Sequence, residues 1–196
     1  MMGFEEALYS LIAEPEATKE FLCAMANFYV DVIQEQFRYF KPDLALVMDH
    51  VATDKGLLMS PQCYREIIKP AQKIVYDCLK TYDVAIGIHV DGRIEELIPD
   101  FAELGVTVIQ PFQVYNDIEK AKKEYGIAAI GGWDSFGPGN DPNADEETIR
   151  ASVRKAMDAY APTGDFAIWF SGAALGSAEK MGWLADEAEK YGRQFY

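Results

Sequence analysis

The chain has 196 residues, of which 49% are hydrophobic and 13% aromatic, so it is long enough to bury one sizeable core, and we expect a single domain over residues 1–196. The formal net charge of −14 argues against nucleic acid and anionic lipid as partners, because both would be repelled. The sequence contains no apolar run of about 18 residues that could span a membrane, and its start lacks the features of a signal peptide. The three cysteines, Cys23, Cys63 and Cys78, have no ligand-like spacing, which favours reduced thiols and a cytoplasmic location.

The first third of the sequence predicts helices. From Pro15 to Pro42, apolar residues recur at three- and four-residue steps, which is typical of a long amphipathic helix that ends before a proline. A short strand over 44–48 follows. Ser60-Pro61 then begins a second long helix, with serine as the N-cap and proline at the first helical position. The apolar residues that we expect this helix to bury are Tyr64, Ile67, Ile68, Ala71, Ile74, Val75, Cys78 and Leu79.

Strands and helices then alternate at short intervals. We expect strands over 84–90, 106–113, 127–134 and 166–171, and helices around 94–104, 117–125, 146–160 and 179–191. The strands are nearly continuous apolar runs, which indicates burial on both faces of a parallel sheet. The absence of a glycine-rich phosphate-binding loop favours a barrel wall over a dinucleotide-binding fold. A closed (β/α)8 barrel typically has about 250 residues, and only five strands are predicted here, so either the barrel is partial or the count of strands is too low. The predicted fold is α/β, a partial TIM-type barrel of about five βα units preceded by helices.

Each predicted strand ends in polar residues, and both histidines lie at such ends. The tips read Met48-Asp49-His50, Ile88-His89-Val90-Asp91-Gly92, Gln110-Pro111-Phe112-Gln113, Gly131-Gly132-Trp133-Asp134 and Phe170-Ser171-Gly172. Because α/β barrels build their active sites at the carboxyl ends of the strands, this pattern predicts an enzyme-type site.

The first two tips carry the strongest candidates. His89 and Asp91 are two residues apart and point to the same side of the pleat, which suits metal ligation or acid–base chemistry. The alternative is a hydrogen-bonded pair that closes the turn, with Gly92 giving the backbone its freedom. Asp49 and His50 are adjacent, so only one of them faces the barrel interior in a regular strand. We expect Asp49 to face inward and His50 to cap the loop.

The later tips are open to two interpretations. Asp134 is either an acid–base group or an aspartate that caps the turn after its strand. Trp133 either walls an apolar pocket or packs in the core. Gln110, beside Pro111, is a candidate neutral hydrogen-bonding group.

The order and spacing of these motifs resemble the carboxyl-terminal part of the uroporphyrinogen decarboxylase superfamily, which also contains corrinoid-dependent methyltransferases. The motifs that carry the resemblance are Asp49-His50 with Gly56 and Ser60-Pro61, then His89-Val90-Asp91-Gly92, then Gly131-Gly132-Trp133-Asp134. The resemblance extends over residues 1–196 and implies that the strands are the fourth to eighth of a (β/α)8 barrel. The first strands of that barrel have no counterpart in this sequence.

The resemblance implies the methyltransferase branch rather than porphyrinogen decarboxylation. The decarboxylases end their eighth strand in Gly-His-Gly, where this sequence has Phe170-Ser171-Gly172-Ala173. Their substrate carries several carboxylates, which the acidic strand tips of this chain would repel. The methyltransferases bind zinc through a His-x-Cys motif and a later cysteine. Here His89-Val90-Asp91 keeps the histidine but has a carboxylate, and Ser171 stands about where the later cysteine would be.

Imidazole and carboxylate still suit Zn²⁺, so we expect a zinc site at His89 and Asp91. The implied reaction is methyl transfer between a small methylated compound and a corrinoid carried on another protein. The expected catalytic residues are Asp49, His50 and Asp134, and the expected substrate contacts are Gln110, Trp133 and Ser171.

Two alternatives remain open. One is a carboxy-lyase of the same superfamily that acts on a smaller carboxylate. The other is a non-catalytic partial barrel that binds a partner chain. An open barrel of five strands leaves two unpaired edges, so we expect either a homo-oligomer or a partner chain that completes the barrel.

Overall fold

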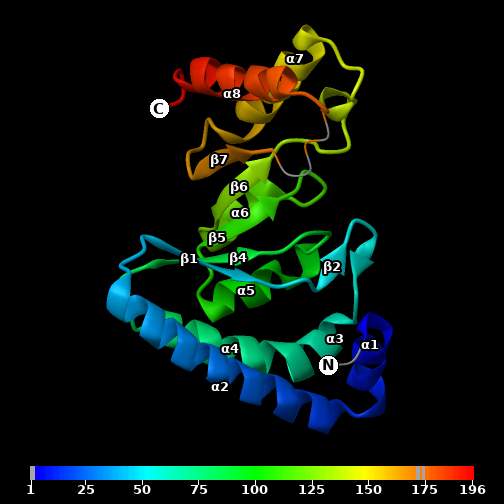
Figure 1. Ribbon diagram of the computed structural model, residues 1–196, viewed down its shortest axis with the longest axis vertical. Coiled ribbons are helices and arrows are strands. Elements are labelled where there is room, and N and C mark those ends of the chain that lie inside the picture. Colours follow the sequence, from blue (N-terminus) through cyan, green and yellow to red (C-terminus); the bar gives the residue numbers. More distant parts are fainter. Residues whose placement is uncertain (1–2, 171–172, 174) are drawn as a thin grey trace. The chain divides into compact units, whose positions relative to one another are not determined.

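A computed structural model describes residues 3–170, 173 and 175–196 of the chain (Figure 1). Its strands are β1 Leu44–Met48, β2 Ala52–Thr53, β3 Gly56–Leu57, β4 Ala85–His89, β5 Val108–Phe112, β6 Ala128–Gly132 and β7 Phe166–Trp169. Its α-helices are α1 Phe4–Ala13, α2 Pro15–Tyr39, α3 Pro61–Cys63, α4 Lys69–Leu79, α5 Ile98–Leu104, α6 Ile118–Tyr125, α7 Glu146–Tyr160 and α8 Ala178–Gly192. Short turns of other helix types are η1 Tyr64–Ile68, η2 Glu95–Leu97 and η3 Pro138–Asn140.

The main sheet confirms the predicted α/β class. Among the described residues, it has five strands in the order β1-β4-β5-β6-β7. β1 runs parallel to β4, with Leu44 opposite Ala85, and β6 runs parallel to β7. Helices alternate with these strands along the chain. The antiparallel hairpin of β2 and β3 was not predicted from the sequence.

The predicted helix starts are confirmed by their capping hydrogen bonds. The side chain of Ser60 accepts from the backbone N–H of Cys63, and Pro61 is the first residue of α3. Asp117, Asp145 and Ser177 cap α6, α7 and α8 in the same way. Such a cap satisfies one of the backbone donors that a helix start leaves without a partner.

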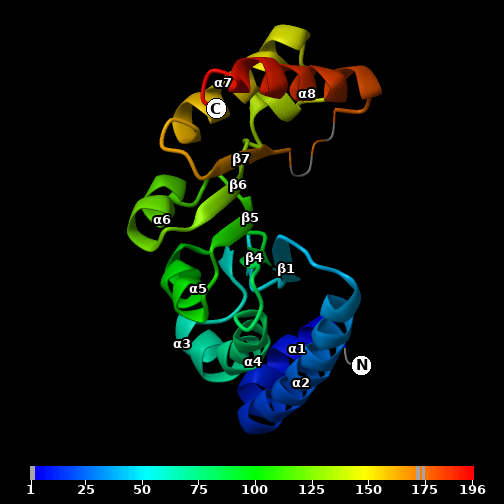
Figure 2. The same cartoon turned by 90° about the vertical axis from the view of Figure 1, so that its left-hand side faces the viewer.

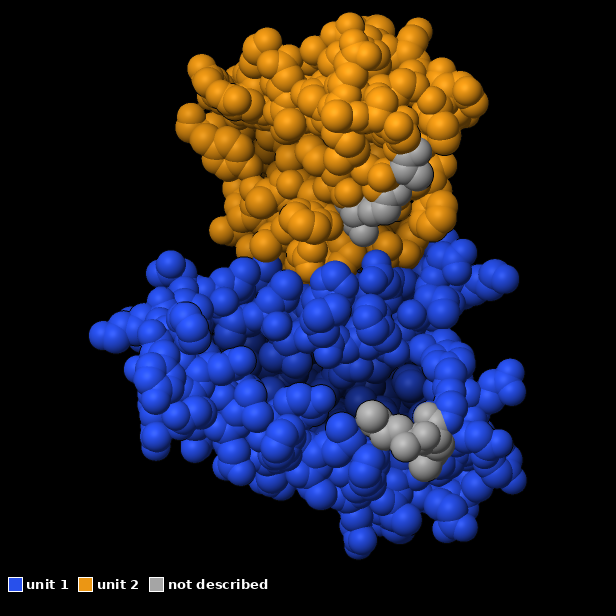
Figure 3. Space-filling view, in the orientation of Figure 1, with its two compact units in different colours: residues 1–108 blue, residues 109–196 orange. Residues whose placement is uncertain are grey.

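The chain divides into two compact units, residues 1–108 and 109–196 (Figure 3). In the first unit, α2 packs against both α1 and α4, as the two ribbon views agree (Figures 1 and 2). Arg65 and Lys69 both bind the buried carboxylate of Asp100, at 2.9 and 2.7 Å, and so tie this helical layer to α5. In the second unit, α7 packs on α8, and Arg150 of α7 binds Asp186 of α8 at 2.8 Å.

The buried face of the second long helix differs from the predicted one. Ile68, Ile74 and Cys78 are only partly buried, whereas Gln72 and Tyr76 are buried. The reason is the π-helical turn η1, which inserts an extra residue and rotates the following turns. Pro70 favours such an irregular turn because it has no N–H for an α-helical hydrogen bond.

The expectation of burial on both faces holds for the central strands and is wrong for β1. Ile86 and Ile88 of β4 are buried, but Leu44, Leu46 and Met48 of β1 are exposed. β1 is the terminal strand of the sheet, so one side of it lacks the covering that its neighbours have. Within the described part of the chain, no helix is long and apolar enough to cross a membrane.

Candidate functional site

Two histidines and one aspartate come together at the carboxyl ends of β1 and β4. The Nε2 atom of His89 lies 3.6 Å from an Oδ2 atom of Asp91, and the Nδ1 atom of His50 lies 4.0 Å from the same oxygen. The two imidazole rings are nearly perpendicular, with their centroids 5.9 Å apart. The side chains of His50 and Asp91 are well exposed and that of His89 is mostly covered. One carboxylate oxygen therefore lies within 4.0 Å of two imidazoles at a solvent-accessible strand end.

The hairpin of β2 and β3 fixes the loop that carries Asp91. The backbone N–H of Arg93 donates to the carbonyl oxygen of Thr53 at 2.8 Å, and the Arg93 side chain donates to the carbonyl oxygen of Asp54 at 2.8 Å. Gly92 lies between Asp91 and Arg93 and has a φ of +105°. A β-carbon at Gly92 would lie 2.6 Å from the backbone nitrogen of Thr53. Only glycine fits this close approach without strain.

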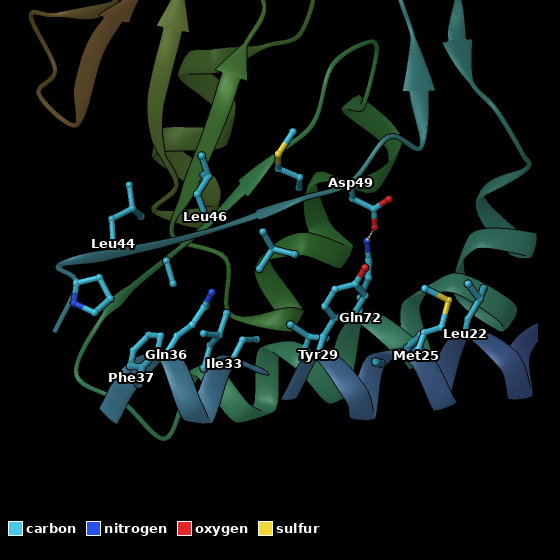
Figure 4. A pocket seen from close by; sticks show the side chains of 18 of the residues that line it. Leu22, Met25, Tyr29, Ile33, Gln36, Phe37, Leu44, Leu46, Asp49 and Gln72 are labelled. Atoms are coloured by element: carbon cyan, nitrogen blue, oxygen red, sulfur yellow. Dashed lines mark hydrogen bonds between the residues drawn. The ribbon is translucent and has the colours of Figure 1, made fainter. Parts of the chain in front are cut away.

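Asp49 points away from this cluster, which reverses the expected orientation of the adjacent pair Asp49 and His50. Its Oδ2 atom accepts a hydrogen bond of 2.5 Å from Gln72 of α4, on the helical side of β1 (Figure 4). His50 lies beside His89 instead. Burial raises the pKa of the Asp49 carboxyl, although the hydrogen bond from Gln72 and the proximity of His50 act in the opposite direction.

Asp49 ends a short buried relay that the sequence analysis missed. The Tyr64 hydroxyl donates to Oε1 of Gln72 at 2.5 Å, and Gln72 donates onward to Asp49. The hydroxyl of Tyr76 is also buried, with no hydrogen-bond partner among the described residues, and burial followed by the charge of Asp49 raises the pKa of Tyr76. The available signal was a glutamine at helical spacing among apolar residues, since a buried amide must find partners.

Two of the candidates in the second unit, Asp134 and Trp133, make hydrogen bonds within that unit. Asp134 accepts a hydrogen bond from the backbone N–H of Phe136 at 3.1 Å, as in a capped turn. Trp133 is buried, and its indole N–H donates to Ser152 of α7 at 2.9 Å. Gln110 is buried and precedes Pro111 through a cis peptide bond. Ser171 lies outside the described residues, so its predicted role stays a prediction.

The pair of His89 and Asp91 has the spacing of two ligands of one zinc ion. Ligands about 2.1 Å from a tetrahedral Zn²⁺ lie roughly 3.4 Å apart, and these two atoms are 3.6 Å apart. A catalytic zinc site uses three protein ligands. Among the residues that the structure describes, no three His, Cys, Asp or Glu side chains are grouped closely enough to hold a metal. The residues present therefore fit two ligand positions, and not a complete protein ligand set.

The comparisons with known proteins agree with the sequence resemblance. The family model described as uroporphyrinogen decarboxylase (URO-D) matches residues 1–171. A methyltransferase from Methanosarcina mazei has a similar structure, with a TM-score of 0.69 and 17% sequence identity. The similarity covers 97% of this chain and 54% of the methyltransferase, so the chain spans about half the length of that protein. No curated protein matches the chain.

The parallel sheet with alternating helices is consistent with the predicted partial TIM-type barrel, and nearly the whole chain superimposes on part of the longer methyltransferase. The family match covers well over half of the sequence and includes β1 and β4, whose ends carry the histidines and Asp91. The chain belongs to the uroporphyrinogen decarboxylase family.

Proposed function

We propose that the chain takes part in methyl transfer between a small methylated compound and a corrinoid carried on another protein. The observation that carries this proposal is the cluster of His50, His89 and Asp91 at the carboxyl ends of two parallel strands. Barrel enzymes use this edge for chemistry. The structural similarity to a methyltransferase supports the choice of reaction within the family.

In this proposal, His89 and Asp91 are ligands of a zinc ion. A bound Zn²⁺ would supply a Lewis acid that polarises an oxygen or thiol group of the substrate. The Nε2 atom of His89 and the Oδ2 atom of Asp91, 3.6 Å apart, are the two atoms that would hold it, and the Gly92 turn keeps the carboxylate in place. The described residues thus supply two of the three protein ligands of a catalytic zinc site, and water or substrate would fill the open position.

His50 is the group that we assign to proton transfer. Its Nδ1 atom faces Asp91 at 4.0 Å, and more than half of its side chain is exposed, so the ring is accessible to a substrate. Asp49 is assigned to supporting the strand end through Gln72, because its carboxyl faces α4. Asp134, Gln110, Trp133 and Ser171 remain predicted contacts of the completed site.

Metal content tests the zinc assignment directly. Protein purified without chelator and without affinity nickel is expected to contain about one zinc per chain, as one site of this kind requires. His89→Ala should lose the zinc, whereas Asp54→Asn, which changes a carboxylate on the neighbouring hairpin, should retain it. Unchanged zinc in the His89→Ala variant would remove the ligand assignment.

Methyl transfer is then assayed from a methylated free corrinoid to a thiol, and from small methylated compounds to a reduced corrinoid, followed by the corrinoid absorption spectrum. Loss of transfer in His50→Ala with zinc retained is the expected result. Absence of any transfer by the zinc-loaded protein would contradict the proposed reaction for this chain alone.

A carboxy-lyase is the second candidate, favoured by the description of the matching family. Turnover of a porphyrinogen or a simple carboxylate without corrinoid would select it. A third candidate is a partial barrel that acts by binding a partner, supported by the exposed residues of the terminal strand β1. The proposal includes a cytoplasmic location, where the three free cysteines would stay reduced.

A further inference from the structure

A hollow of about 650 Å³ lies between β1 and the helices α2 and α4 of the first unit (Figures 3 and 4). Its volume is within the range of roughly 300–1,000 Å³ that is typical of small-molecule sites. Apolar side chains of α2 form one wall, and every residue from Leu44 to Asp49 also lines the hollow. Since a strand rises about 3.3 Å per residue, these residues span roughly 16 Å. The hollow therefore suits a ligand with an elongated apolar body.

The polar side chains that line the hollow are few. Asp49 and Gln72 lie together and are joined by a hydrogen bond of 2.5 Å (Figure 4). Gln36 of α2 lies beside Phe37, away from that pair (Figure 4). The lining contains no Lys or Arg within the described part of the chain, and its charged side chain there is that of Asp49. An apolar hollow with a small number of converging polar groups is the usual form of a ligand site.

The Asp49 carboxyl is not bound by a Lys or Arg in the described contacts. Its side-chain partner is the neutral amide of Gln72. Burial raises the pKa of Asp49, and the nearby His50 offsets burial only in part. Asp100, a buried carboxylate of the same unit, is instead bound by Arg65 and Lys69. Because buried charges in proteins are normally paired, Asp49 is a carboxylate that a cationic ligand could pair.

We propose that the hollow binds an organic amine, whose ammonium group pairs with Asp49 and whose apolar body lies between β1 and α2. An ammonium group donates charge-assisted hydrogen bonds to a carboxylate. An anionic ligand would be repelled by the same carboxylate. A sugar or nucleotide would lose its hydrogen bonds to water against walls that offer few polar partners.

This amine site is separate from the cluster of His50, His89 and Asp91. Asp49 points toward Gln72 of α4, whereas His50 lies beside His89. Successive residues of a strand point to opposite faces, which explains why neighbours in the sequence serve different sites. Amine binding requires neither a metal nor methyl transfer, so this inference goes beyond the proposed function and is tested independently of it.

Three probes with the same alkyl chain test the role of charge: octylamine, octanol and octanoate. Each is titrated into the full chain at neutral pH and followed by calorimetry, so that only the head group differs. We expect octylamine to bind at least tenfold more tightly than octanol, and octanoate not to bind. Asp49→Asn should weaken octylamine binding at least tenfold and leave octanol binding unchanged. Asp54→Asn is the matched control, because Asp54 is an exposed carboxylate outside the hollow, and it should leave both affinities unchanged.

A second pair of variants tests the location of the alkyl chain. Ala45 lines the hollow, so the ring added by Ala45→Phe would fill part of it and should weaken both octylamine and octanol at least tenfold. Ala167→Phe on β7 is the control, because Ala167 is exposed and lies in the second unit. Octylamine should also slow hydrogen exchange of the amides of 44–49. Circular dichroism checks that each variant remains folded.

Equal binding of octylamine and octanoate by the unmodified chain would overturn the proposal, whether or not the variants fold. Unchanged octylamine binding in folded Asp49→Asn, or protection confined to residues outside β1, α2 and α4, would also overturn it. Sedimentation velocity without a probe examines another occupant. A dimer that protects 44–49 and excludes octylamine would show that a second copy of this chain fills the hollow, which would refute the amine site.

Discussion

The hydrogen bonds from Tyr64 to Gln72 and from Gln72 to Asp49 predict how substitutions at these residues change the free energy of unfolding. Gln72→Leu replaces the amide by an apolar side chain of similar size. It removes the acceptor of the Tyr64 hydroxyl, which is fully buried, and the side-chain donor of the Asp49 carboxyl. Each buried polar group that loses its partner costs roughly 1–3 kcal/mol. The free energy of unfolding should therefore fall by roughly 2–6 kcal/mol.

Adding Tyr64→Phe to this variant removes the hydroxyl that has lost its acceptor. The double variant should be more stable than Gln72→Leu alone by about 1–3 kcal/mol, although Tyr64→Phe on its own should destabilise the protein. Urea denaturation measures the midpoint and slope for each variant. Gln62→Leu is the control, because Gln62 is exposed and donates only to Glu66 on its own helix in the described contacts. If the double variant is less stable than Gln72→Leu, Gln72 does not satisfy the Tyr64 hydroxyl.

Three other predictions concern charge and backbone. Asp100→Ala should cost about 2–4 kcal/mol in chemical denaturation, near the lower end for broken buried pairs, because its two cationic partners still reach water. Burial alone would raise the pKa of Asp100, but the hydrogen bonds from Arg65 and Lys69 outweigh burial and lower that pKa. The stabilisation by the Asp100 carboxylate should therefore be present at neutral pH and lost as the pH falls through the folded-state pKa. Asp49 should give the opposite pH dependence, because burial raises the pKa of its carboxyl above the ordinary 3.8. The free energy of unfolding should fall as the pH rises from 3.8 through the raised pKa. Melting temperatures against pH should lose this decline in Asp49→Asn, and an unchanged decline would contradict the assignment. Gly92→Ala should cost roughly 1–3 kcal/mol, because φ is positive and the added β-carbon would clash with the backbone of Thr53. Gly182→Ala on α8, where nothing lies within 4 Å, should stabilise the protein by up to about 1 kcal/mol. Equal effects of the two substitutions on stability would refute the steric reasoning.

Local patterns were sufficient to predict most of the secondary structure. Pro15 and the apolar spacing located α2, and the predicted cap at Ser60 located the start of the next long helix. The buried face of α4 was not predictable in this way. It depends on the π-helical turn before Pro70, and no periodicity rule anticipates an inserted residue.

The sequence was sufficient to predict which strand ends carry the candidate site, but not which way every side chain there points. His89 and Asp91 were placed together because two residues on one strand end share a side. The choice between Asp49 and His50 could not be made locally, because the partner that orients Asp49 is Gln72, 23 residues later. Likewise, the hydrogen bond of Trp133 to Ser152 depends on how α7 packs.

The backbone bonds between the hairpin and the Gly92 turn have a consequence for ligand binding. Thr53 and Asp54 accept from Arg93 through main-chain carbonyl oxygens, so these contacts survive changes of the hairpin's side chains. The hairpin and the Gly92 turn therefore become ordered when the chain folds, so binding of a ligand carries no further entropic cost for ordering them. Affinity at His50, His89 and Asp91 should therefore depend mainly on the chemistry of those three side chains. The same scaffold could accept a different ligand set by substitution there, without redesign of the loops.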